Sequence, residues 1–398
     1  MNSQGKALSV GLDPSFGEGG TTSFGLPGMS YGATLCVTPS NRIVAVGMPG
    51  DSTHTIVLAR FEQDGAIDPT FGADGVATLE MSADLEHVVH HCLALADERV
   101  VLLGKRNVPG YLAQDYFFTC VRADGTLDTS FGNAGTTVVA PTNRNFHAWS
   151  MLFHGQGKIL AHFEGVQMPE NYRANALVRL NPDGHFDTSF GTGGIHYVER
   201  DLRLPDCVAR PDGRLLMAGT EGLYSVVRGY DAAGQPDLAF GDGGVAQLPS
   251  PTGEEMYTER LALQDDGRIL VQGLLASSSD NPRSYLMKLR PDGERDPSFN
   301  RGEPLILPRI SGRGMVVESS GRVLALEREE LADKAQLRSL TPDGFDESPP
   351  FQLPLAGPVY HFPEEQLLRH VPGTLLVSAN ITDPQTQTRR LTISRLLI

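Results

Sequence analysis

The side chains best suited to metal chemistry are the histidines at positions 87, 90 and 91, which follow Glu86. Imidazole nitrogens and carboxylates are the usual ligands of zinc and related transition metals. The run from Val88 to Leu95 is typical of a strand, however, and not of a helix. On a strand, His87 and His91 lie on one face while His90 lies on the other. The three imidazoles are therefore not expected to meet at one ion, and no metal site is predicted.

Three other histidines occupy similar loop positions in three segments of the chain. They are His147, His196 and His361. Carboxylates stand in comparable loops, at Glu199, Asp201, Glu254 and Glu255. If these groups converge, a metal-assisted hydrolase or lyase remains an alternative function.

Nothing in the chain has the form of a nucleophilic or phosphate-binding motif. There is no Gly-x-Ser-x-Gly, no phosphate loop and no His-Glu-x-x-His. The four cysteines, Cys36, Cys92, Cys120 and Cys207, have no Cys-x-x-Cys spacing. Cys36, Cys92 and Cys207 share what looks like one repeat register, and we expect them to be small core residues too far apart to bridge. We predict no catalytic residue and no cofactor.

A phrase of the form hydrophobic-Asp-Pro/Thr-Ser/Thr-Phe-Gly, called the anchor below, recurs at intervals of 50 to 60 residues. Its aspartates and phenylalanines are Asp13 and Phe16, Asp68 and Phe71, Asp128 and Phe131, Asp187 and Phe190, Asp237 and Phe240, and Asp296 and Phe299, with a faint copy at Asp346. An Asp in this setting caps a turn by accepting backbone N–H groups. The phenylalanine is expected to be a buried wedge. We therefore interpret the anchors as structural joints and not as a repeated functional motif.

The interval from Phe131 to Asp187 shows the repeating unit. It contains four strand-like runs separated by turns: Thr136–Ala140, Ala148–Phe153, Lys158–Phe163 and Ala174–Leu180. A basic residue near the end of the fourth run is expected to reach the anchor Asp; these residues are Arg60, Arg122, Arg179, Arg228, Lys288, Arg338 and Arg395. Four strands in about 50 residues are typical of one blade of a β-propeller. The count of anchors predicts an all-β fold with seven blades of four antiparallel strands.

The chain is predicted to be one propeller domain over residues 1–398. The expected blades span about 16–67, 71–127, 131–186, 190–236, 240–295, 299–345 and 351–398. The last blade has no anchor after it, and the first anchor has no blade before it. We therefore expect the N-terminal segment 8–17 to pack on the C-terminal blade and close the ring, which leaves only short protected edges.

The anchor resembles the delta-60 repeat family of bacterial proteins, which pairs a Leu-Asp-x-Ser-Phe-Gly-x-x-Gly phrase with an Ala-x-Asp-Gly-Lys/Arg-hydrophobic strand. The resemblance extends over residues 8–398 and is closest at Asp13, Asp68, Asp128 and Asp187. The chain departs from the pattern at Pro236, Arg295, Asn300 and Pro349. The resemblance implies a propeller-type repeat fold and supplies no catalytic residues.

Composition excludes several classes of partner. The formal net charge is −15, which disfavours nucleic acid and anionic membrane surfaces. No run of about 18 apolar residues is present, so no membrane insertion is expected. The segment from Met1 to Lys6 has no apolar stretch like that of a signal peptide. A cytoplasmic location is therefore the default expectation, with export that needs no N-terminal signal left open.

Function is expected where the repeats differ, because binding residues concentrate in variable loops of a rigid scaffold. The candidates are polar and aromatic loop residues: Arg106, Tyr111, Asn145, His147, Tyr172, Arg173, His196, Tyr257, Arg283 and His361. Such residues suit recognition of a protein or a carbohydrate. The leading hypothesis is thus a non-enzymatic binding propeller. The alternatives are the metal-assisted enzyme at the mouth of the channel and an exported toxin-associated or surface module.

Overall fold

The structure is a computed structural model. It describes residues 10–398 except 26–30, 51, 108–113, 140–145, 168–171, 199–201, 223, 249, 251–252, 277–282, 308–310, 330–333, 354–365 and 383–388. Within this part of the chain the one helical element is the 3₁₀ turn η1 (Asn300–Gly302). None of the described helices has the length and apolarity needed to cross a membrane.

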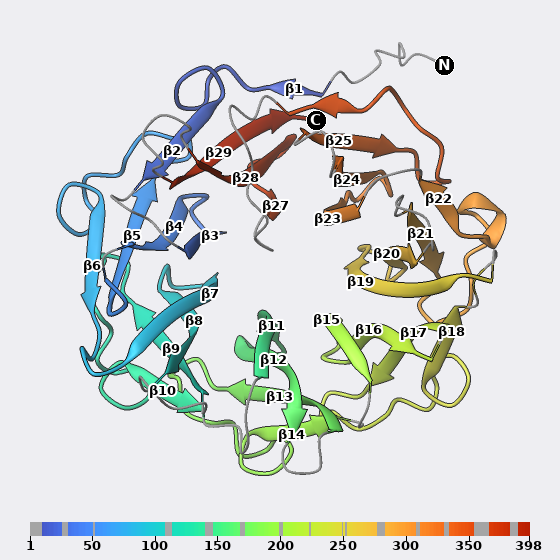
Figure 1. The fold of residues 1–398 in the computed structure, drawn as a ribbon, viewed down its shortest axis with the longest axis horizontal. Coiled ribbons are helices and arrows are strands. Elements are labelled where there is room, and N and C mark those ends of the chain that lie inside the picture. Colours follow the sequence, from blue (N-terminus) through green and yellow to red (C-terminus); the bar gives the residue numbers. More distant parts are fainter. Residues whose placement is uncertain are drawn as a thin grey trace.

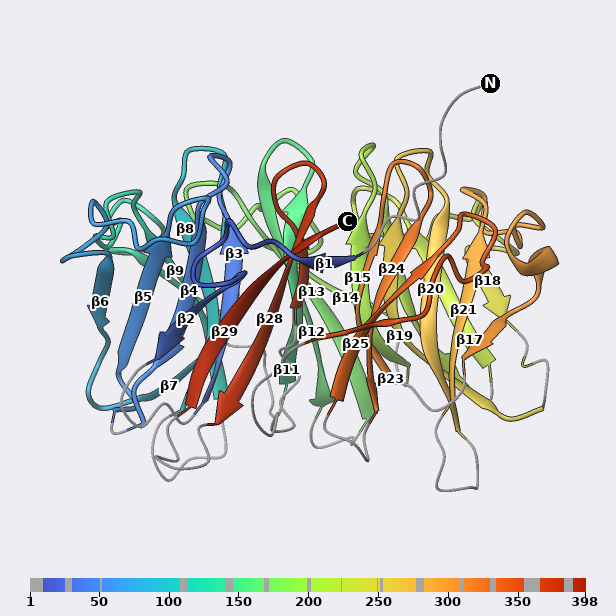
Figure 2. The same cartoon turned by 90° about the horizontal axis from the view of Figure 1, so that it is seen from above.

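Seven antiparallel sheets, six of four strands and one of five, stand around a central axis, and each is one blade (Figures 1 and 2). Blade 1 is β3 (Tyr31–Val37), β4 (Ile43–Met48), β5 (Thr55–Phe61) and β6 (Val76–Glu80); blade 2 is β7 (Glu86–Ala94), β8 (Val100–Asn107), β9 (Gln114–Val121) and β10 (Thr136–Val139); blade 3 is β11 (Phe146–His154), β12 (Lys158–Gln167), β13 (Tyr172–Leu180) and β14 (Ile195–Val198). The first strand of each blade is innermost and the fourth is outermost. The seven-bladed all-β fold is therefore confirmed.

The second half of the ring repeats this order. Blade 4 is β15 (Arg203–Ala209), β16 (Leu215–Glu221), β17 (Tyr224–Tyr230) and β18 (Val245–Leu248); blade 5 is β19 (Glu255–Leu263), β20 (Ile269–Ala276), β21 (Arg283–Leu289) and β22 (Leu305–Leu307). Blade 6 is β23 (Ser311–Val317), β24 (Val323–Glu329), β25 (Lys334–Leu340) and β26 (Phe351–Gln352); blade 7 is β27 (Gln366–Arg369), β28 (Thr374–Thr382) and β29 (Arg389–Leu397), completed by β1 (Gly11–Leu12) and β2 (Thr21–Gly25).

Blade 7 closes the ring with strands from both ends of the chain. β2 pairs with β29 from Thr21 opposite Ser394 to Gly25 opposite Arg390. β1 pairs with the end of the same strand, where Gly11 lies opposite Leu397. The predicted closure by the N-terminal segment is confirmed, and β29 is thereby covered along its outer edge.

The sheets do not begin where the anchors stand. The strand after each anchor pairs with the strand before it, as β10 does with β9 across Asp128 and Phe131. Each sequence interval opened by an anchor therefore runs from the outermost strand of one blade to the third strand of the next. Each anchor is a connection inside a blade, between its third and fourth strands.

Apolar side chains fill the spaces between neighbouring blades. Between blades 2 and 3, for example, Phe131 packs with Leu103 and Tyr116 on one side and with Ile159 and Phe163 on the other. Six anchor phenylalanines are almost wholly buried in such clusters: Phe16, Phe71, Phe131, Phe190, Phe240 and Phe299. Burial of a side chain of this size contributes about 1.5–3 kcal/mol.

Each anchor also joins its blade to the next one through hydrogen bonds. Asp68 accepts hydrogen bonds from the backbone N–H and the hydroxyl of Thr70, at 2.9 and 2.6 Å, and from Arg60 Nε at 2.7 Å. The guanidinium of Arg60 lies over the ring of Phe71 and donates to the carbonyl of Ala123 in the next blade. Gly72 has a positive φ of 59°, and a Cβ there would lie 2.1 Å from the Val76 carbonyl oxygen. Only glycine fits that bend without strain.

Arg122 reaches its anchor Asp128 as expected, with Nη2 3.3 Å from Oδ1, but neither Arg122 nor Arg228 stands in the register of Arg60. The position whose carbonyl accepts from the anchor Asp N–H is Arg60 in blade 1, but it is Cys120 in blade 2 and Gly229 in blade 4. Arg228 instead pairs with Glu221 at 2.8 Å. Cations from other positions reach the equivalent carbonyl of the next blade: Arg99 reaches Pro182 at 3.3 Å, and Arg210 reaches Pro291 at 2.6 Å.

The expected register of the cysteines is also wrong in one place. Cys92 and Cys207 lie opposite equivalent residues, Leu102 and Met217, but Cys36 is one position further along its strand. Its side chain faces blade 2, and a hydrogen bond with the Cys92 thiol, together with burial, raises the pKa of Cys36. These two thiols are therefore neighbours across a blade junction.

Candidate binding site at the mouth of the channel

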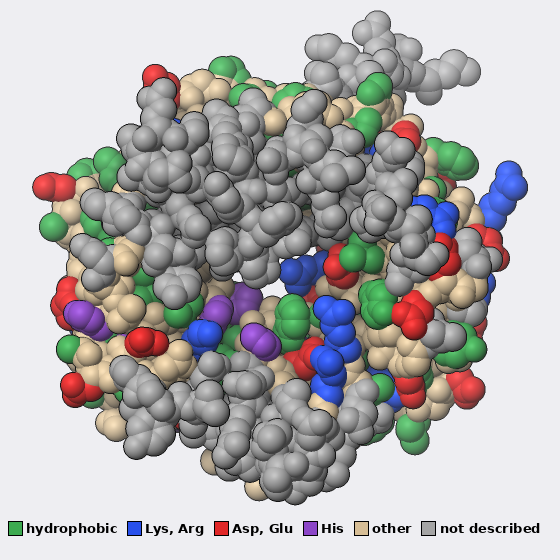
Figure 3. All heavy atoms as spheres, in the orientation of Figure 1, with side chains coloured by type: hydrophobic (Ala, Val, Ile, Leu, Met, Phe, Trp, Pro, Cys, Tyr) green, Lys and Arg blue, Asp and Glu red, His purple; other side chains and the backbone are tan. Residues whose placement is uncertain are grey.

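The two faces of the ring carry different connections. In each blade the turn between the first two strands and the anchor between the last two emerge on one face, as antiparallel pairing requires. The loops between the second and third strands and the crossovers between blades emerge on the other face. We call this second face the loop face; Figures 1 and 3 look onto it, and it lies at the bottom of Figure 2.

A β-bulge interrupts the innermost strand in six of the seven blades. The pairing with the second strand shifts between Tyr31 and Thr34, Val89 and His91, Ala148 and Ser150, Arg203 and Asp206, Thr258 and Arg260, and Gly312 and Gly314. A bulged residue leaves the ladder and its side chain is re-aimed. On the innermost strands of blades 2, 3 and 5 the residues left out of the ladder are His90, Trp149 and Glu259, each of them half-buried.

The bulge in β7 changes the expected arrangement of the histidines. His87 packs edge-on against Phe117 on the side of blade 1, with ring centroids 5.4 Å apart. His91 lies after the bulge and faces blade 3, where its Nε2 is 3.1 Å from the carbonyl oxygen of Ala148. The prediction that His87 and His91 share a face is therefore wrong, because one extra residue separates them in the ladder.

His90 lies among basic groups near the loop face. Burial, together with the neighbouring groups His91, Lys105 and His147, lowers the pKa of His90 to about 3. Burial likewise lowers the pKa of His91 to about 4, although its bond to Ala148 opposes this shift. At neutral pH these two imidazoles are uncharged, and each carries one N–H donor and one acceptor nitrogen.

Trp149 lies at the bulge of the next blade. It is half-buried on β11, and its ring lies 6.4 Å from that of the exposed His147, at an interplanar angle of 54°. Its indole N–H has no hydrogen-bond partner among the described residues. An indole has an apolar ring face and one N–H donor at its edge, which suits ligands that carry both apolar and polar groups. Figure 3 shows imidazole, basic and acidic side chains around the central opening on this face.

The channel wall in blades 4 and 5 carries a charged pair. Arg260 Nη1 lies 3.8 Å from Asp206 Oδ1, and Asp206 also accepts a hydrogen bond of 2.7 Å from the backbone N–H of Leu261. Burial raises the pKa of Asp206, and the charge of Arg260 opposes that rise. Arg260 also acts electrostatically on His91 in blade 2. Groups from blades 2, 4 and 5 therefore influence one another around the channel.

Two predicted binding residues lie at the rim of blade 5. Tyr257 is on β19 and donates its hydroxyl hydrogen bond to Glu255. Arg283 begins β21 and pairs with Glu254. The carboxylates predicted for the alternative enzyme, Glu254 and Glu255, are thus engaged by this arginine and tyrosine.

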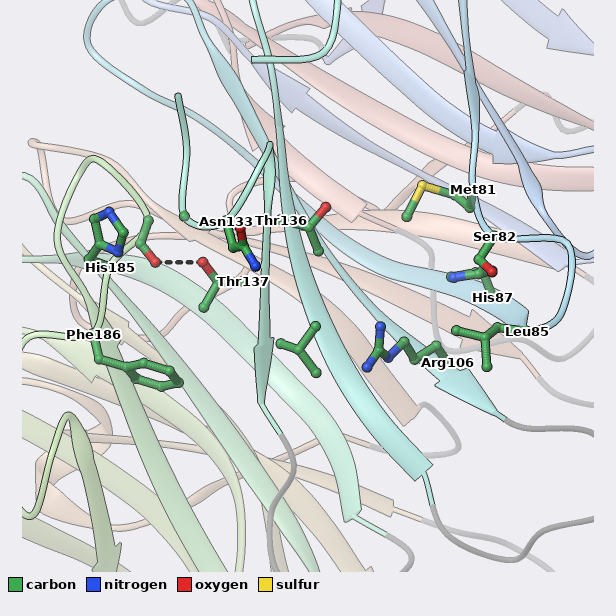
Figure 4. Close-up of a pocket in the computed structure, with 13 residues that line it drawn as sticks. Met81, Ser82, Leu85, His87, Arg106, Asn133, Thr136, Thr137, His185 and Phe186 are labelled. Atoms are coloured by element: carbon green, nitrogen blue, oxygen red, sulfur yellow. Dashed lines mark hydrogen bonds between the residues drawn. The ribbon is translucent and has the colours of Figure 1, made fainter. Parts of the chain in front are cut away.

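Arg106 lies away from the channel, against blade 1. Its guanidinium is 3.2 Å from Asp115, and its side chain lines a pocket of about 590 Å³ with Leu85 and His87. In Figure 4 these three side chains lie on one side of β10, whereas His185 and Phe186 lie on the other. The pocket is thus a shallow feature on both sides of an outer strand, and it does not bring together the residues of the channel.

The remaining predicted residues are dispersed. Arg173 pairs with the buried Glu164. His196 is on β14, the outermost strand, 6.0 Å from the Phe190 ring, so its expected place at the mouth of the channel is wrong. The sequence suggested a loop at His196, but the residue lies on a short outer strand that directly follows an anchor. Tyr111, Asn145 and His361 lie outside the described residues, as do Glu199 and Asp201, and Tyr172 is placed only as the first residue of β13.

Sequence reasoning did not select His90, Lys105, Trp149 or Arg260 as binding residues. His90 and Trp149 lie inside predicted strands, where alternation assigns a side chain to one blade face or the other. A bulge of one residue breaks that alternation, and no turn residue marks it in the sequence. Within the described part of the chain, no group of three or more His, Cys, Asp or Glu side chains is arranged to hold a metal ion.

Comparison with protein families gives one match. Residues 38–71, 157–190 and 264–299 match the model of a β-propeller domain of unknown function, DUF5122. These segments contain the second strand and the anchor of blades 1, 3 and 5 in whole or in part. The chain is similar to this family of propeller repeats over that portion. No curated protein matches the chain.

Several solved structures are similar to this chain. A polysaccharide lyase, Uly1, is 9% identical and superposes with a TM-score of 0.55, covering 100% of this chain and 95% of that one. An α-L-arabinofuranosidase of family GH93 from Fusarium graminearum, in complex with arabinobiose, is 9% identical over 77% of this chain and 93% of that one, with a TM-score of 0.46. A protein of unknown function from Dyadobacter fermentans is 12% identical over 95% and 99%, also with a TM-score of 0.46. At these identities the likeness concerns the propeller architecture alone.

Proposed function

We propose that the protein is a non-enzymatic binding propeller that takes a carbohydrate at the mouth of its channel on the loop face. The observation that carries this proposal is the repeated bulge of the innermost strands. The bulge recurs in blade after blade, yet the residue left out of the ladder differs: it is His90, Trp149 or Glu259 in blades 2, 3 and 5. Constant scaffold and varied side chains are what a recognition surface requires.

The chemistry of these side chains favours a sugar over an extended protein surface. Trp149 offers a half-buried aromatic plane beside His147, and the neutral imidazoles of His90 and His91 in the neighbouring blade offer both donors and acceptors. Ligand sites commonly combine such an apolar plane with a few convergent polar groups. A polysaccharide lyase shares the fold, which is compatible with a role on carbohydrates and adds no site residue. We also propose that the repeats belong to the delta-60 type that the anchors resemble.

The test compares two aromatic substitutions on the same strand. Binding of a panel of oligosaccharides is measured by calorimetry for the native protein, for Trp149→Ala and for Phe153→Ala. Phe153 is 41% exposed near the other end of β11, on the face of the anchors, and is the matched control. We expect Trp149→Ala to weaken binding at least about tenfold, a loss of about 1.4 kcal/mol, with Phe153→Ala unchanged. No binding to any oligosaccharide, together with capture of a protein at this face, would overturn the proposal.

A further inference from the structure

We propose that the junction between blades 6 and 7 binds a segment of a partner protein in which an apolar side chain stands next to an arginine or a lysine. This junction lies on the face of the anchors, at the top of Figure 2, whereas the candidate carbohydrate site is on the loop face. The two sites are separate, so this inference does not rest on the proposed function.

The seventh anchor begins at Glu347 and not at Asp346. The backbone N–H of Glu347 donates to the Ser339 carbonyl at 3.1 Å, as the N–H of Asp68 donates to the Arg60 carbonyl in blade 1. Ser339 therefore stands where blade 1 has the arginine whose guanidinium lies over an anchor phenylalanine. A hydroxyl carries no charge, so this cation is missing from the seventh anchor.

The seventh anchor is also shorter than the others. In blade 1 the fourth strand is reached at Ala77, nine residues after Asp68, whereas in blade 6 the residue in the equivalent pairing is Phe351, only four residues after Glu347. The missing segment is the one that carries the buried ring in the other anchors, as Phe71 does in blade 1. Phe351 itself is the first residue of β26 and is only half-buried. The junction of blades 6 and 7 thus lacks, within the described residues, the buried anchor phenylalanine of the other six.

A pocket of about 370 Å³ lies at this incomplete junction. It is lined by both blades, with Glu318, Ser320, Arg322, Pro342 and Glu347 from blade 6 and Ile398 from blade 7. Pro342 and Ile398 supply apolar contacts, which an aliphatic or aromatic side chain of a partner can use. Such a side chain makes at the seventh junction the kind of contact that the chain's own phenylalanines make at the others.

The charges that line the pocket favour a basic partner. Arg322 lies between two carboxylates, with its Nε 2.6 Å from Glu318 and its Nη1 3.6 Å from Glu347. The side chain of Arg322 is only 6% exposed, whereas those of Glu318 and Glu347 are 25% and 30% exposed. The cation is buried and the two carboxylates reach the surface, so an arginine or lysine of the partner meets opposite charge here.

Arg322 also lacks the carbonyl acceptor that its counterpart in blade 2 has. It directly precedes the second strand of its blade, as Arg99 does, and Arg99 donates to the Pro182 carbonyl of the next blade at 3.3 Å. The Nη1 atom of Arg322 is buried and has no hydrogen-bond partner among the described residues. A backbone carbonyl of a bound segment supplies that acceptor, which favours a peptide over a free cation.

The experiment uses three acetylated and amidated tetrapeptides: Gly-Arg-Phe-Gly, Gly-Gln-Phe-Gly without the charge, and Gly-Arg-Gly-Gly without the ring. Their binding to the native protein, to Glu347→Gln and to Glu62→Gln is measured by calorimetry. Glu62 is the matched control, because it pairs with Arg42 Nε at 3.1 Å and is 40% exposed in blade 1, which keeps its phenylalanine. We expect Gly-Arg-Phe-Gly to bind the native protein about tenfold or more tightly than either other peptide. Glu347→Gln is expected to weaken this binding about fivefold or more, and Glu62→Gln to leave it unchanged.

Equal thermal midpoints verify that the variants keep the fold, and Glu318→Gln takes the place of Glu347→Gln if that variant is less stable. Equal binding of the three peptides, or no binding, overturns the proposal. The same loss in Glu62→Gln also overturns it, since the effect is then general electrostatics. Sedimentation of the native protein tests a second copy of this chain as the occupant: reversible self-association that Glu347→Gln abolishes shows that the partner chemistry proposed here is wrong. None of these outcomes depends on Trp149, so the carbohydrate proposal is tested separately.

Discussion

The anchor carboxylates combine two tasks in one side chain. Burial alone would raise the pKa of Asp128, but hydrogen bonds from Ser130 and Arg99 outweigh burial and lower its pKa to about 2. Ser130 fixes the turn, and Arg99 also reaches the Pro182 carbonyl of the next blade. The ionised carboxylate is thus used entirely within the scaffold, which leaves the anchors little scope for binding a ligand.

The anchor phenylalanine supplies the apolar part of the same joint. Phe131 is fully buried between blades 2 and 3, so Phe131→Ala is expected to lower the free energy of unfolding by roughly 3–5 kcal/mol. Phe345, which precedes the faint seventh anchor Asp, is 61% exposed and serves as the control. Denaturant unfolding of the two variants provides the measurement. Equal small losses for both would show that the ring does not depend on the buried phenylalanine.

Individual side chains show where sequence reasoning stops. The fold was predictable because the anchor recurs along the chain, so the repeat is recognisable even where one copy is irregular. Glu327 directly follows an apolar run in the sequence, but it lies on β24, nearly wholly buried, with Arg338 Nε 2.8 Å away. Cys36 was misplaced by one position for a similar reason. A single sequence does not reveal a buried ion pair or a one-residue shift, because both depend on contacts with a neighbouring blade.

At the scale of the strand, the bulge is the element that sequence patterns could not supply. Alternation assigns the side chains of β7 and β11 to blade faces, and the extra residue then redirects His90 and Trp149. The candidate site depends on this local irregularity, while the anchors depend on the regular repeat. Regular elements are therefore the predictable part of this molecule, and its candidate chemistry lies where regularity fails.

Closure of the ring is a second property of elements. β1 and β2 are the only strands that cover the outer edge of β29 among the described residues, and Asp13 adds a buried ion pair to Arg395 at 2.8 Å. A variant lacking residues 1–25 is expected to expose this edge, to unfold at a lower temperature and to self-associate. Thermal unfolding and light scattering measure both effects. Adding a synthetic peptide of residues 10–25 is expected to restore the midpoint, and a truncated variant as stable as the full chain would contradict the role of the closure.

Across the whole ring, burial depresses the pKa of histidines at several junctions. His162 is fully buried on the side of blade 4, where its Nε2 lies 3.1 Å from Asn175 Oδ1, and Asn175 in turn donates to the Leu202 carbonyl at 3.0 Å. Burial lowers the pKa of His162 to about 4, against the opposing effect of Asn175. Burial likewise lowers the pKa values of His90 and His91. The ring is thus built around imidazoles that it holds in the neutral form.

This arrangement fixes the sign of the response to acid. Between pH of about 6.5 and about 4 the unfolded chain protonates these histidines while the folded chain does not, so stability falls as pH falls. The raised pKa values of Asp206 and Glu327 act in the opposite direction, because those carboxyls take up protons first in the folded state.

For His162 alone the depressed pKa corresponds to a loss on the order of 3 kcal/mol across this window. Denaturant unfolding at several pH values is therefore expected to show a steeper decline for the native protein than for His162→Gln. The exposed His185 is the control, since His185→Gln should retain the native slope; if the two variants have equal slopes, burial of His162 does not govern the response.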